Sequence, residues 1–333
     1  MITEKGLKLD SIIKGHGDFS EILNYNELIN KLDNRHIRSM WGVSVGKILH
    51  FGYDPIIVKQ WSFLRANFDH TILIADLHTA IEEPKIENLE EKSRYTYTYF
   101  KDLCNMHGAS ISYGSSFQYH SEYTQLLYKL LSITPTKSLD KIRIANKQGT
   151  IGSLVYPMMQ IADSAYLKAD ITYGGQNQRA TYMVGREILP KLGLPKPVVL
   201  LSPMSKDIMG KELVKSTTAT RITIHDTDET LKQKIGKMFA PQSIEDNPLL
   251  DSFRYSIIPW FKKINIDTIY GKISIKDYNQ LCEIFLKNET DPYKLKLSAY
   301  FYLSQRLNKI RRYFDKKSYL IDWIDIGALN KKV

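Results

Sequence analysis

The pattern of apolar and polar positions predicts alternating strands and helices over the first two thirds of the chain. Apolar residues recur at helical spacing after Pro55 and over 121–133, 137–167 and 176–193. Between these segments, short apolar runs of strand length lie at 40–46, at 71–75, at the start of 109–118, at 169–175 and at 197–203. This alternation is typical of a parallel sheet with right-handed crossovers, in which ligands bind at the carboxyl ends of the strands.

The two ends of the chain show a different pattern. Residues 1–39 have apolar positions at 22, 23, 28, 29 and 32, which predicts helices. After about residue 205 the strand pattern fades and helical spacing dominates, with one weak strand over 271–275. The expected fold class is therefore α/β, with a Rossmann-like parallel-sheet domain followed by a smaller, mainly helical C-terminal domain.

Charge favours a polyanionic partner without proving one. The chain has a net charge of +10 and a pI of about 9.2. The segment 305–320 concentrates positive charge, and its apolar residues Leu307, Ile310 and Phe314 predict a helix with one basic face. An ordinary solvated face explains that pattern equally well. The basic residues of this segment are Arg306, Lys309, Arg311, Arg312, Lys316 and Lys317.

Several classes of protein are disfavoured. No run of 18 apolar residues occurs, so we expect no membrane span. The first ten residues lack an apolar signal region, so a cytoplasmic location is expected. The eight histidines show no ligand spacing, and no metal site is predicted.

Polar residues and glycines gather where the predicted strands end. His50 and Gly52 lie in the first strand-to-helix turn, and Asp76 and His78 end the second strand. Further along, the set continues with Tyr156, Gln160 and Asp163 on one helical face, and with Gly174, Gly175 and Gln178 after a later strand. Glycines permit close approach of a ligand, and a helix N-terminus favours phosphate. Each residue taken singly is more often simply packed or exposed, but together they predict a site for a small polar molecule beside a nucleotide.

Several motifs along the chain resemble those of a known family. They read GKILHFGY, TILIADLHTAIE, YGSSFQ followed by EYT, LVYPMMQIADSAYLKADITYGGQNQR and DPYKLK. The fourth is the most specific, because its spacing runs without a gap. From about residue 10 to residue 315 the chain resembles a tyrosyl-tRNA synthetase of the archaeal and eukaryotic type, a class I aminoacyl-tRNA synthetase.

The resemblance implies roles on the ATP side of the site. His50-Phe51-Gly52-Tyr53 would be the first class I signature, often written HIGH. His50 and Lys47 would stabilise the negative charge that develops on the ATP phosphates as the amino-acid carboxylate attacks the α-phosphorus. Gly174, Gly175 and Asn177 would lie along the adenosine ribose. Mg²⁺ would enter only with ATP, and no tightly bound cofactor is implied.

The resemblance also implies an amino-acid pocket. Tyr156, Gln160 and Gln178 would hold the substrate ammonium group, and Asp163 would accept the tyrosine phenol. Gly42 and His78 would complete the pocket. Position 40 departs from the pattern, because Met40 stands where typical members carry a tyrosine that helps to hold the phenol. A related or modified aromatic amino acid therefore remains an alternative substrate.

Two further departures affect catalysis and tRNA recognition. The second signature, KMSKS, is not intact, and Lys211 and Lys215 of GKELVKST are the lysines that could serve the phosphates. Lys294 stands where typical members carry an acidic residue that reads the first anticodon base, while Tyr270 keeps an aromatic residue to stack on it. Arg311 and Arg312 are further candidates for tRNA contact.

The expected organisation and function follow from the resemblance. An N-terminal helical segment (1–39) precedes a Rossmann-like catalytic domain (40–205) with a dimerisation insert at about 115–155, implying a homodimer. A signature loop (206–228) links it to a helical anticodon-binding-like domain (229–333). Three functions remain open: a tRNA ligase that activates tyrosine or a related amino acid with ATP, a paralogue that activates an aromatic amino acid for small-molecule or peptide biosynthesis, and a non-catalytic RNA-binding relative.

Overall fold

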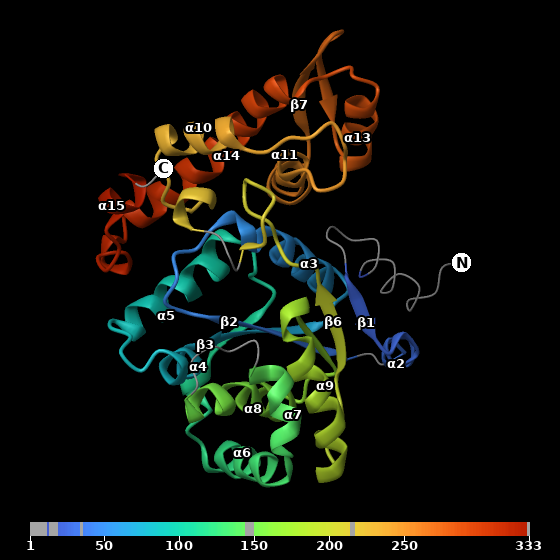
Figure 1. Ribbon diagram of the computed structural model, residues 1–333, viewed down its shortest axis with the longest axis vertical. Helices are drawn as coiled ribbons and strands as arrows, with labels where there is room; N and C mark the ends of the chain where they lie inside the picture. Colours follow the sequence, from blue (N-terminus) through green and yellow to red (C-terminus); the bar gives the residue numbers. More distant parts are fainter. Residues whose placement is uncertain (1–11, 13–18, 34–35, 144–149, 214–216, 332–333) are drawn as a thin grey trace. The chain divides into compact units, whose positions relative to one another are not determined.

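The computed structural model describes residues 12, 19–33, 36–143, 150–213 and 217–331 (Figure 1). The chain forms two compact units. The first comprises Met1–Lys47 and Gln60–Pro203, and the second comprises Ile48–Lys59 and Met204–Val333. Among the described residues, no helix has both the length and the apolar composition that crossing a membrane requires.

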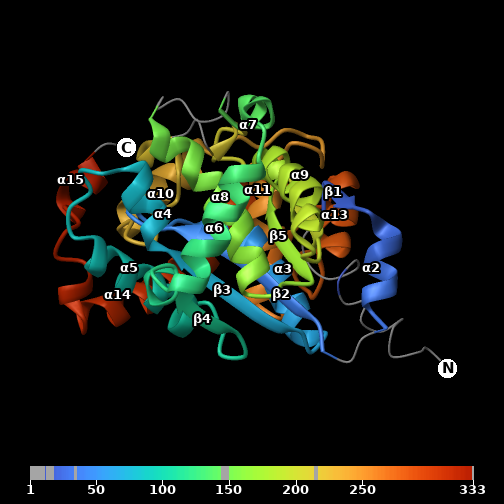
Figure 2. The same cartoon turned by 90° about the horizontal axis from the view of Figure 1, so that it is seen from below.

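The first unit contains a six-stranded sheet with the order β1-β6-β5-β2-β3-β4 (Figure 2). Its strands are β1 (Glu21–Leu23), β2 (Arg38–Ser44), β3 (Asp69–Ala75), β4 (Ser110–Tyr113), β5 (Ile171–Gly175) and β6 (Val198–Ser202). All neighbouring pairs are parallel except β1 with β6. The switch point of the sheet lies between β2 and β5. From β2 the chain adds β3 and β4 on one side of that strand, and it then adds β5 and β6 on its other side. Ligands bind at such a switch point in open α/β sheets.

Both faces of this sheet are covered. On one face, Phe63 of α3 packs against Tyr173 of β5 and His70 of β3, with ring centroids 5.5 Å apart in each case. The other face carries Met40, which belongs to the buried cluster of α6 and α8. The helices of this unit are α2 (Tyr25–Lys31), α4 (Asp76–Glu82), α5 (Leu89–Thr98), α6 (Ser121–Ile133), α7 (Thr136–Arg143), α8 (Ile151–Tyr166) and α9 (Arg179–Ile188). The residues of α3 (Asp54–Arg65) are divided, with those up to Lys59 in the second unit and those from Gln60 in the first.

The second unit is mainly helical and has one antiparallel hairpin. Its helices are α10 (Asp228–Lys237), α11 (Pro248–Asp251), α12 (Ile258–Phe261), α13 (Tyr278–Leu286), α14 (Pro292–Asp315) and α15 (Ile326–Lys331), and the hairpin pairs β7 (Ile264–Thr268) with β8 (Gly271–Ile275). The long helix α14 begins with a clear capping signal, since Asp291 accepts a hydrogen bond from the backbone N–H of Lys294 and Pro292 stands at the first helical position. Leu303, Leu307 and Phe314 of this helix are buried.

A buried ion pair joins the start of α3 to α14 within the second unit. The Arg306 guanidinium donates to both Asp54 carboxylate oxygens, at 2.6 and 3.1 Å. It also donates to the Ser256 carbonyl oxygen at 2.7 Å, and its Cζ lies 3.6 Å from the centroid of the Trp260 ring. Asp54 is fully buried and Arg306 is 7% exposed. A planar guanidinium suits this combination of bidentate pairing and stacking.

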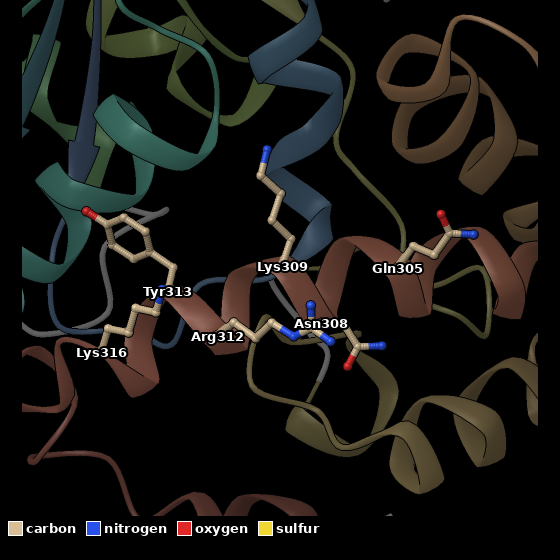
Figure 3. Close-up of a pocket in the computed structure, with 6 residues that line it drawn as sticks. All are labelled: Gln305, Asn308, Lys309, Arg312, Tyr313 and Lys316. Carbon is tan, nitrogen blue, oxygen red and sulfur yellow. The ribbon is translucent and has the colours of Figure 1, made fainter.

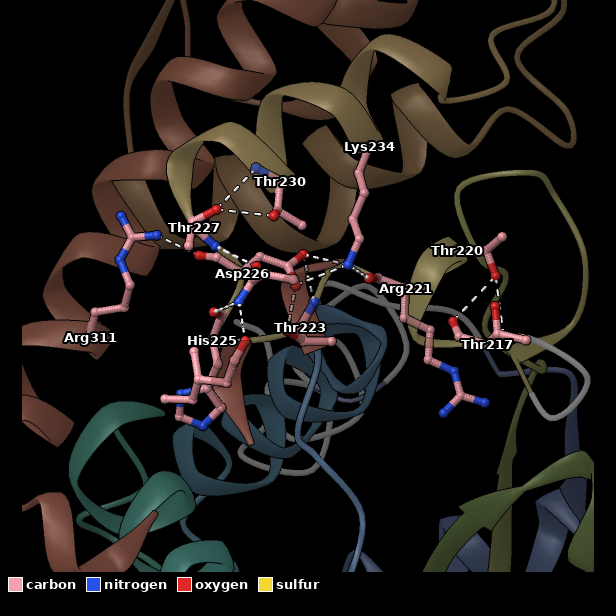
Figure 4. A network of polar contacts seen from close by, with 12 residues as sticks. Thr217, Thr220, Arg221, Thr223, His225, Asp226, Thr227, Thr230, Lys234 and Arg311 are labelled. Atoms are coloured by element: carbon pink, nitrogen blue, oxygen red, sulfur yellow. Dashed lines mark hydrogen bonds and ion pairs between the residues drawn. The ribbon is translucent and has the colours of Figure 1, made fainter. Parts of the chain in front are cut away.

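A second buried pair fixes the segment before α10 (Figure 4). The Lys234 ammonium group donates to both oxygens of Asp226, at 2.9 and 2.8 Å, and to the Arg221 carbonyl oxygen at 2.6 Å. Thr223 donates to the same carboxylate through its hydroxyl and its backbone N–H. Both charged side chains are fully buried, so the charges are paired and hydrogen-bonded as burial requires.

The predicted α/β fold class is confirmed, and most predicted elements are present. The expectation of helices alone over 1–39 is wrong for its described part, because Glu21–Leu23 forms β1 on the edge of the sheet. The helix predicted over 305–320 ends at Asp315. Arg306 does not belong to an exposed basic face, because the Asp54 pair buries it. The strand at 271–275 is present, and its partner β7 was not predicted.

Removing the Arg306 charge should destabilise the protein strongly. Arg306→Met leaves the Asp54 carboxylate buried without its partner, and we expect the free energy of unfolding to fall by about 3–5 kcal/mol. Urea denaturation followed by circular dichroism measures the change. Lys309→Met, on the same helix but exposed, is the control and should stay within about 0.5 kcal/mol of wild type. Equal losses of stability in the two variants would contradict the stabilising role of the Arg306–Asp54 ion pair.

The buried His70 ring should make the free energy of unfolding decrease as the pH is lowered. Its ring nitrogens lie 2.8 Å from Ser39 Oγ and 2.8 Å from Gln60 Oε1, and burial lowers its pKa to about 3. Because the unfolded chain binds this proton near its ordinary pKa of 6.5, the stabilisation is complete above pH ~6.5 and is lost as pH falls toward about 3. Urea midpoints measured between these values should decline less steeply for His70→Gln than for wild type. If the urea midpoints of the two proteins decline in parallel with pH, His70 does not contribute to the pH dependence of stability.

Candidate functional site

A buried carboxylate on α8 organises one cluster of the first unit. Asp163 is 1% exposed, and three side chains donate to it. Oδ1 accepts from Gln118 Nε2 at 2.7 Å and from the Tyr123 hydroxyl at 2.8 Å, and Oδ2 lies 3.1 Å from His78 Nε2. Burial first, and then the Asp163 charge, raise the pKa of the Tyr123 phenol far above its ordinary value. Tyr123 therefore stays protonated and donates.

The contacts of His78 indicate its tautomer. Its Nε2 faces the Asp163 carboxylate, while its Nδ1 lies 3.5 Å from Gln118 Nε2, a donor. A neutral ring with its proton on Nε2 satisfies both neighbours. The edge of the His78 ring meets the Tyr156 ring, with centroids 4.9 Å apart. The predicted residues His78, Tyr156 and Asp163 therefore lie together.

A second polar group lies one turn earlier on α8. Gln160 Nε2 donates to Gln178 Oε1 at 3.3 Å, and the Tyr182 hydroxyl donates to the same oxygen at 3.3 Å. Burial, opposed by the hydrogen bond with Gln160 and reinforced by the Asp163 charge, raises the pKa of Tyr182 to about 12. Gly174 is required here, because a Cβ would come within 2.5 Å of the Tyr182 hydroxyl and 2.7 Å of Gln178 Oε1. The close approach of β5 to these side chains thus depends on glycine.

Asp76 has a structural role at the end of β3. Its Oδ1 accepts from the backbone N–H groups of Leu77 and Ser115, at 2.8 and 2.9 Å, and its Oδ2 accepts from Ser115 Oγ at 2.5 Å. A Cβ on Gly114 would lie 2.9 Å from Asp76 Oδ1 and 2.5 Å from Gln118 Oε1. Asp76 therefore holds the turn after β4, which carries Gln118 toward Asp163.

The remaining predicted residues of this unit lie within or just after β2 and β5. Met40 is buried and Gly42 is exposed, both on β2, and Lys47 follows as an exposed side chain. Gly175 ends β5, and Asn177 is exposed in the turn after it. This arrangement leaves Lys47 and Asn177 accessible at the edge of the sheet where ligands bind.

The His50-Phe51-Gly52-Tyr53 turn lies in the second unit, immediately before α3. His50 forms a bridge with Thr223, the Phe51 N–H donates to the Ile222 carbonyl oxygen at 3.0 Å, and the His50 and Tyr53 rings stack 4.8 Å apart. A Cβ on Gly52 would lie 2.1 Å from Leu213 Cδ1. The turn is thus held against the described part of the predicted signature loop (206–228).

The signature loop is described only in part. Asp207 caps a tight turn by accepting from the backbone N–H groups of Met209 and Lys211, both at 2.9 Å. Lys211 is exposed beside this turn. Lys215 lies outside the described residues.

The predicted tRNA-binding residues fall into two groups. Tyr270 is 77% exposed in the hairpin turn, which is joined to the segment before α14 by the Ile269 N–H and the Glu289 carbonyl oxygen at 2.7 Å. Lys294 Nζ lies 3.5 Å from Asp291 in the first turn of α14. Arg311 is engaged inside the protein, since it donates to the Asp226 carbonyl oxygen and to Asp228 at 2.7 Å.

Arg312 lies instead along an open side of α14 (Figure 3). The residues that line this shallow hollow are Gln305, Asn308, Lys309, Arg312, Tyr313 and Lys316. Three of the six carry positive charge and none is acidic, so this part of the basic segment can attract an anion.

Sequence reasoning missed several residues that the structure brings together. Gln118 and Tyr123 stand in the motifs YGSSFQ and EYT, yet only the fold shows that both donate to Asp163. Tyr182 was unassigned, although its i+4 spacing from Gln178 placed both on one helical face.

Comparison with known proteins agrees with this geometry. Residues 32–307 match the family model described as tRNA synthetases class I (W and Y). The tyrosine–tRNA ligase of Methanopyrus kandleri is 30% identical over 277 residues, which cover 80% of this chain and 85% of that protein. A probable cytoplasmic tyrosine–tRNA ligase of Enterocytozoon bieneusi is 29% identical over 301 residues, 87% of each chain.

A solved structure has the same fold. The tyrosyl-tRNA synthetase of Archaeoglobus fulgidus, complexed with L-tyrosine, superposes with a TM-score of 0.83 at 27% identity and covers 92% of this chain and 99% of that one. The family match extends over most of the chain, including the Asp163 cluster and the His50 turn. The resemblance seen in the sequence is therefore confirmed, and the chain belongs to the class I tRNA synthetases of the tryptophan and tyrosine family.

Proposed function

We propose that this protein activates tyrosine with ATP to form tyrosyl-adenylate and transfers the tyrosyl group to tRNA. The observation that carries the proposal is the Asp163 cluster on the switch-point side of the sheet, because a buried carboxylate with oriented donors is suited to bind a hydroxyl group. The names of its relatives as tyrosine–tRNA ligases support the choice of tyrosine.

The residues of the first unit supply amino-acid binding. The phenol donates to Asp163, while His78, Gln118 and Tyr123 hold that carboxylate in place. The carbonyl oxygen of Gln160 and the Tyr156 hydroxyl accept from the substrate ammonium group, and Gln178, which already contacts Gln160, fixes the orientation of that amide. Gly42 leaves room beside β2, since a Cβ there would meet nothing closer than 3.9 Å.

Activation requires the substrate carboxylate to attack the α-phosphorus of ATP and to displace pyrophosphate. His50, Gly52 and Tyr53 form the turn that would face the phosphates, and Lys47, Lys211 and Lys215 would supply positive charge. Gly174, Gly175 and Asn177 would lie along the ribose, and Mg²⁺ would accompany ATP. No covalent enzyme intermediate is needed, since positioning and electrostatic stabilisation supply the rate.

The two parts of the chain then have separate roles. Residues 40–205 serve as the catalytic domain, 206–228 as the signature loop and 229–333 as the tRNA-binding domain. Exposed Tyr270 offers a stacking surface for a base, and Lys294 and Arg312 offer charge to the RNA backbone. The exposed part of Arg311 would add to this charge.

ATP–pyrophosphate exchange tests the proposal. We expect exchange with tyrosine, and an Asp163→Asn variant should lose about 100-fold in kcat/KM, because the phenol loses a charged acceptor. Asp170→Asn, a carboxylate at the start of β5 that pairs with Lys31, is the matched control and should keep its activity. Charging of tRNA is measured next. Exchange without charging of any tRNA would favour the biosynthetic paralogue, and absence of exchange with every aromatic amino acid would contradict activation.

We also propose that the protein is a homodimer through the segment 115–155. The described part of this segment exposes large apolar side chains: Tyr119 is 72% exposed, Tyr128 is 65% exposed and Ile151 is 81% exposed. Exposed apolar groups gathered in one segment suit a protein interface.

Sedimentation velocity tests the homodimer. We expect wild type to sediment as a dimer and the double variant Tyr128→Glu, Ile151→Glu to sediment as a monomer, because each carboxylate would be buried without a partner. Tyr319→Glu, a 59% exposed tyrosine elsewhere on the chain, is the control and should remain dimeric. A monomeric wild type would rule out this interface.

A further inference from the structure

A buried hydroxyl group in β5 lacks a hydrogen-bond partner in the structure. Thr172 is 2% exposed, and its Oγ1 makes no hydrogen bond. Buried polar atoms are nearly always paired, and leaving one unpaired costs free energy. A partner from outside the fold would satisfy this hydroxyl.

The Thr172 side chain lies where the pairing between β2 and β5 ends. Pairing between β2 and β5 is confined to Ser39 with Ile171 and Met40 with Thr172, whereas β2 pairs with β3 along its whole length. Beyond Met40 and Thr172, the ends of the two strands are not joined by ladder hydrogen bonds. Thr172 therefore lies at the base of the switch point.

Its neighbours show that Thr172 faces the Asp163 side of the sheet. Met40, directly beside it in the register, packs in the same buried cluster as Tyr123 and Ala162. Paired residues on adjacent strands project to the same face. Gly174, two residues later on the same face of β5, lies against Tyr182, which shares Gln178 Oε1 as a hydrogen-bond acceptor with Gln160 of α8.

The hydrogen-bonding capacity around Asp163 is complementary to a phenol. Asp163 Oδ1 already accepts two hydrogen bonds, but Oδ2 has only His78 as a donor. A carboxylate oxygen can accept more than one hydrogen bond, so Oδ2 can take a phenol proton. The phenol oxygen then needs a donor. Met40 has none, whereas the Thr172 hydroxyl has one to give.

We propose that Thr172 is a specificity-determining residue, whose hydroxyl donates to the phenol oxygen of bound tyrosine. Thr172 would take over the second phenol contact, which the residue at position 40 cannot make, and Met40 would form an apolar wall beside the ring. Phenylalanine would leave Thr172 and Asp163 Oδ2 without this partner and would be rejected. This inference rests on the proposed function.

The test compares tyrosine with phenylalanine binding by isothermal titration calorimetry, so it does not depend on the altered signature loop. Thr172→Val keeps the shape of the side chain and removes the hydroxyl. We expect the ratio of the Kd for phenylalanine to the Kd for tyrosine to fall about tenfold, because tyrosine binding alone is weakened. Thr172→Ser keeps the hydroxyl and should stay within about twofold of wild type. Thr96→Val is the control, since that buried hydroxyl donates to the Lys92 carbonyl oxygen within α5, and it should leave the ratio unchanged.

The outcomes separate this inference from the proposed function. Tyrosine binding by wild type with an unchanged ratio in Thr172→Val would overturn the role of Thr172 and leave tyrosine as the substrate. A wild type that binds neither amino acid would overturn both. If Thr172→Val weakens binding of both amino acids equally, its hydroxyl is structural and the inference fails.

Discussion

The Arg306–Asp54 pair is the constraint on which the second unit depends. Asp54 opens α3 directly after the His50 turn, while Arg306 lies 252 residues later, within α14. Because a buried carboxylate needs a partner, the pair fixes the start of α3 against α14. The bridge between His50 and Thr223 and the approach of Leu213 to Gly52 hold the turn just before α3 against the same unit. These contacts agree with the grouping of Ile48–Lys59 with Met204–Val333 in one unit.

In the first unit, a network of hydrogen bonds around Asp163 positions the polar side chains. Three donors converge on Asp163 from α4, from the turn after β4 and from α6. Asp76 supports this convergence by holding the turn that carries Gln118. The polar cluster is therefore part of the hydrogen-bonding of the fold itself.

Much of this architecture could be predicted from local patterns, whereas long-range pairing could not. The strands β2, β3 and β6 are apolar runs of sufficient length to be recognised. Strand β1 is too short for any periodicity, because its three residues depend on β6 for pairing. Arg306 looks like a surface residue until its distant partner is known. Gln118 and Thr172 could not be assigned for a related reason, since their roles depend on neighbours brought together only by the sheet and by α8.

The helix α14 faces two environments, and this limits how the chain can change. Its inward side holds Arg306 and Arg311, which are bound to Asp54, Asp228 and main-chain oxygens. Its outward side carries Lys309 and Arg312, Lys316 follows directly after its last residue, and no carboxylate lines the hollow that these three residues share. The helical repeat separates these tasks by one or two positions. A single-residue insertion within α14 would rotate every later residue by about 100°. It would turn cations into the core and core residues toward water, so the outward residues of this helix can be substituted more freely than its internal register can be shifted.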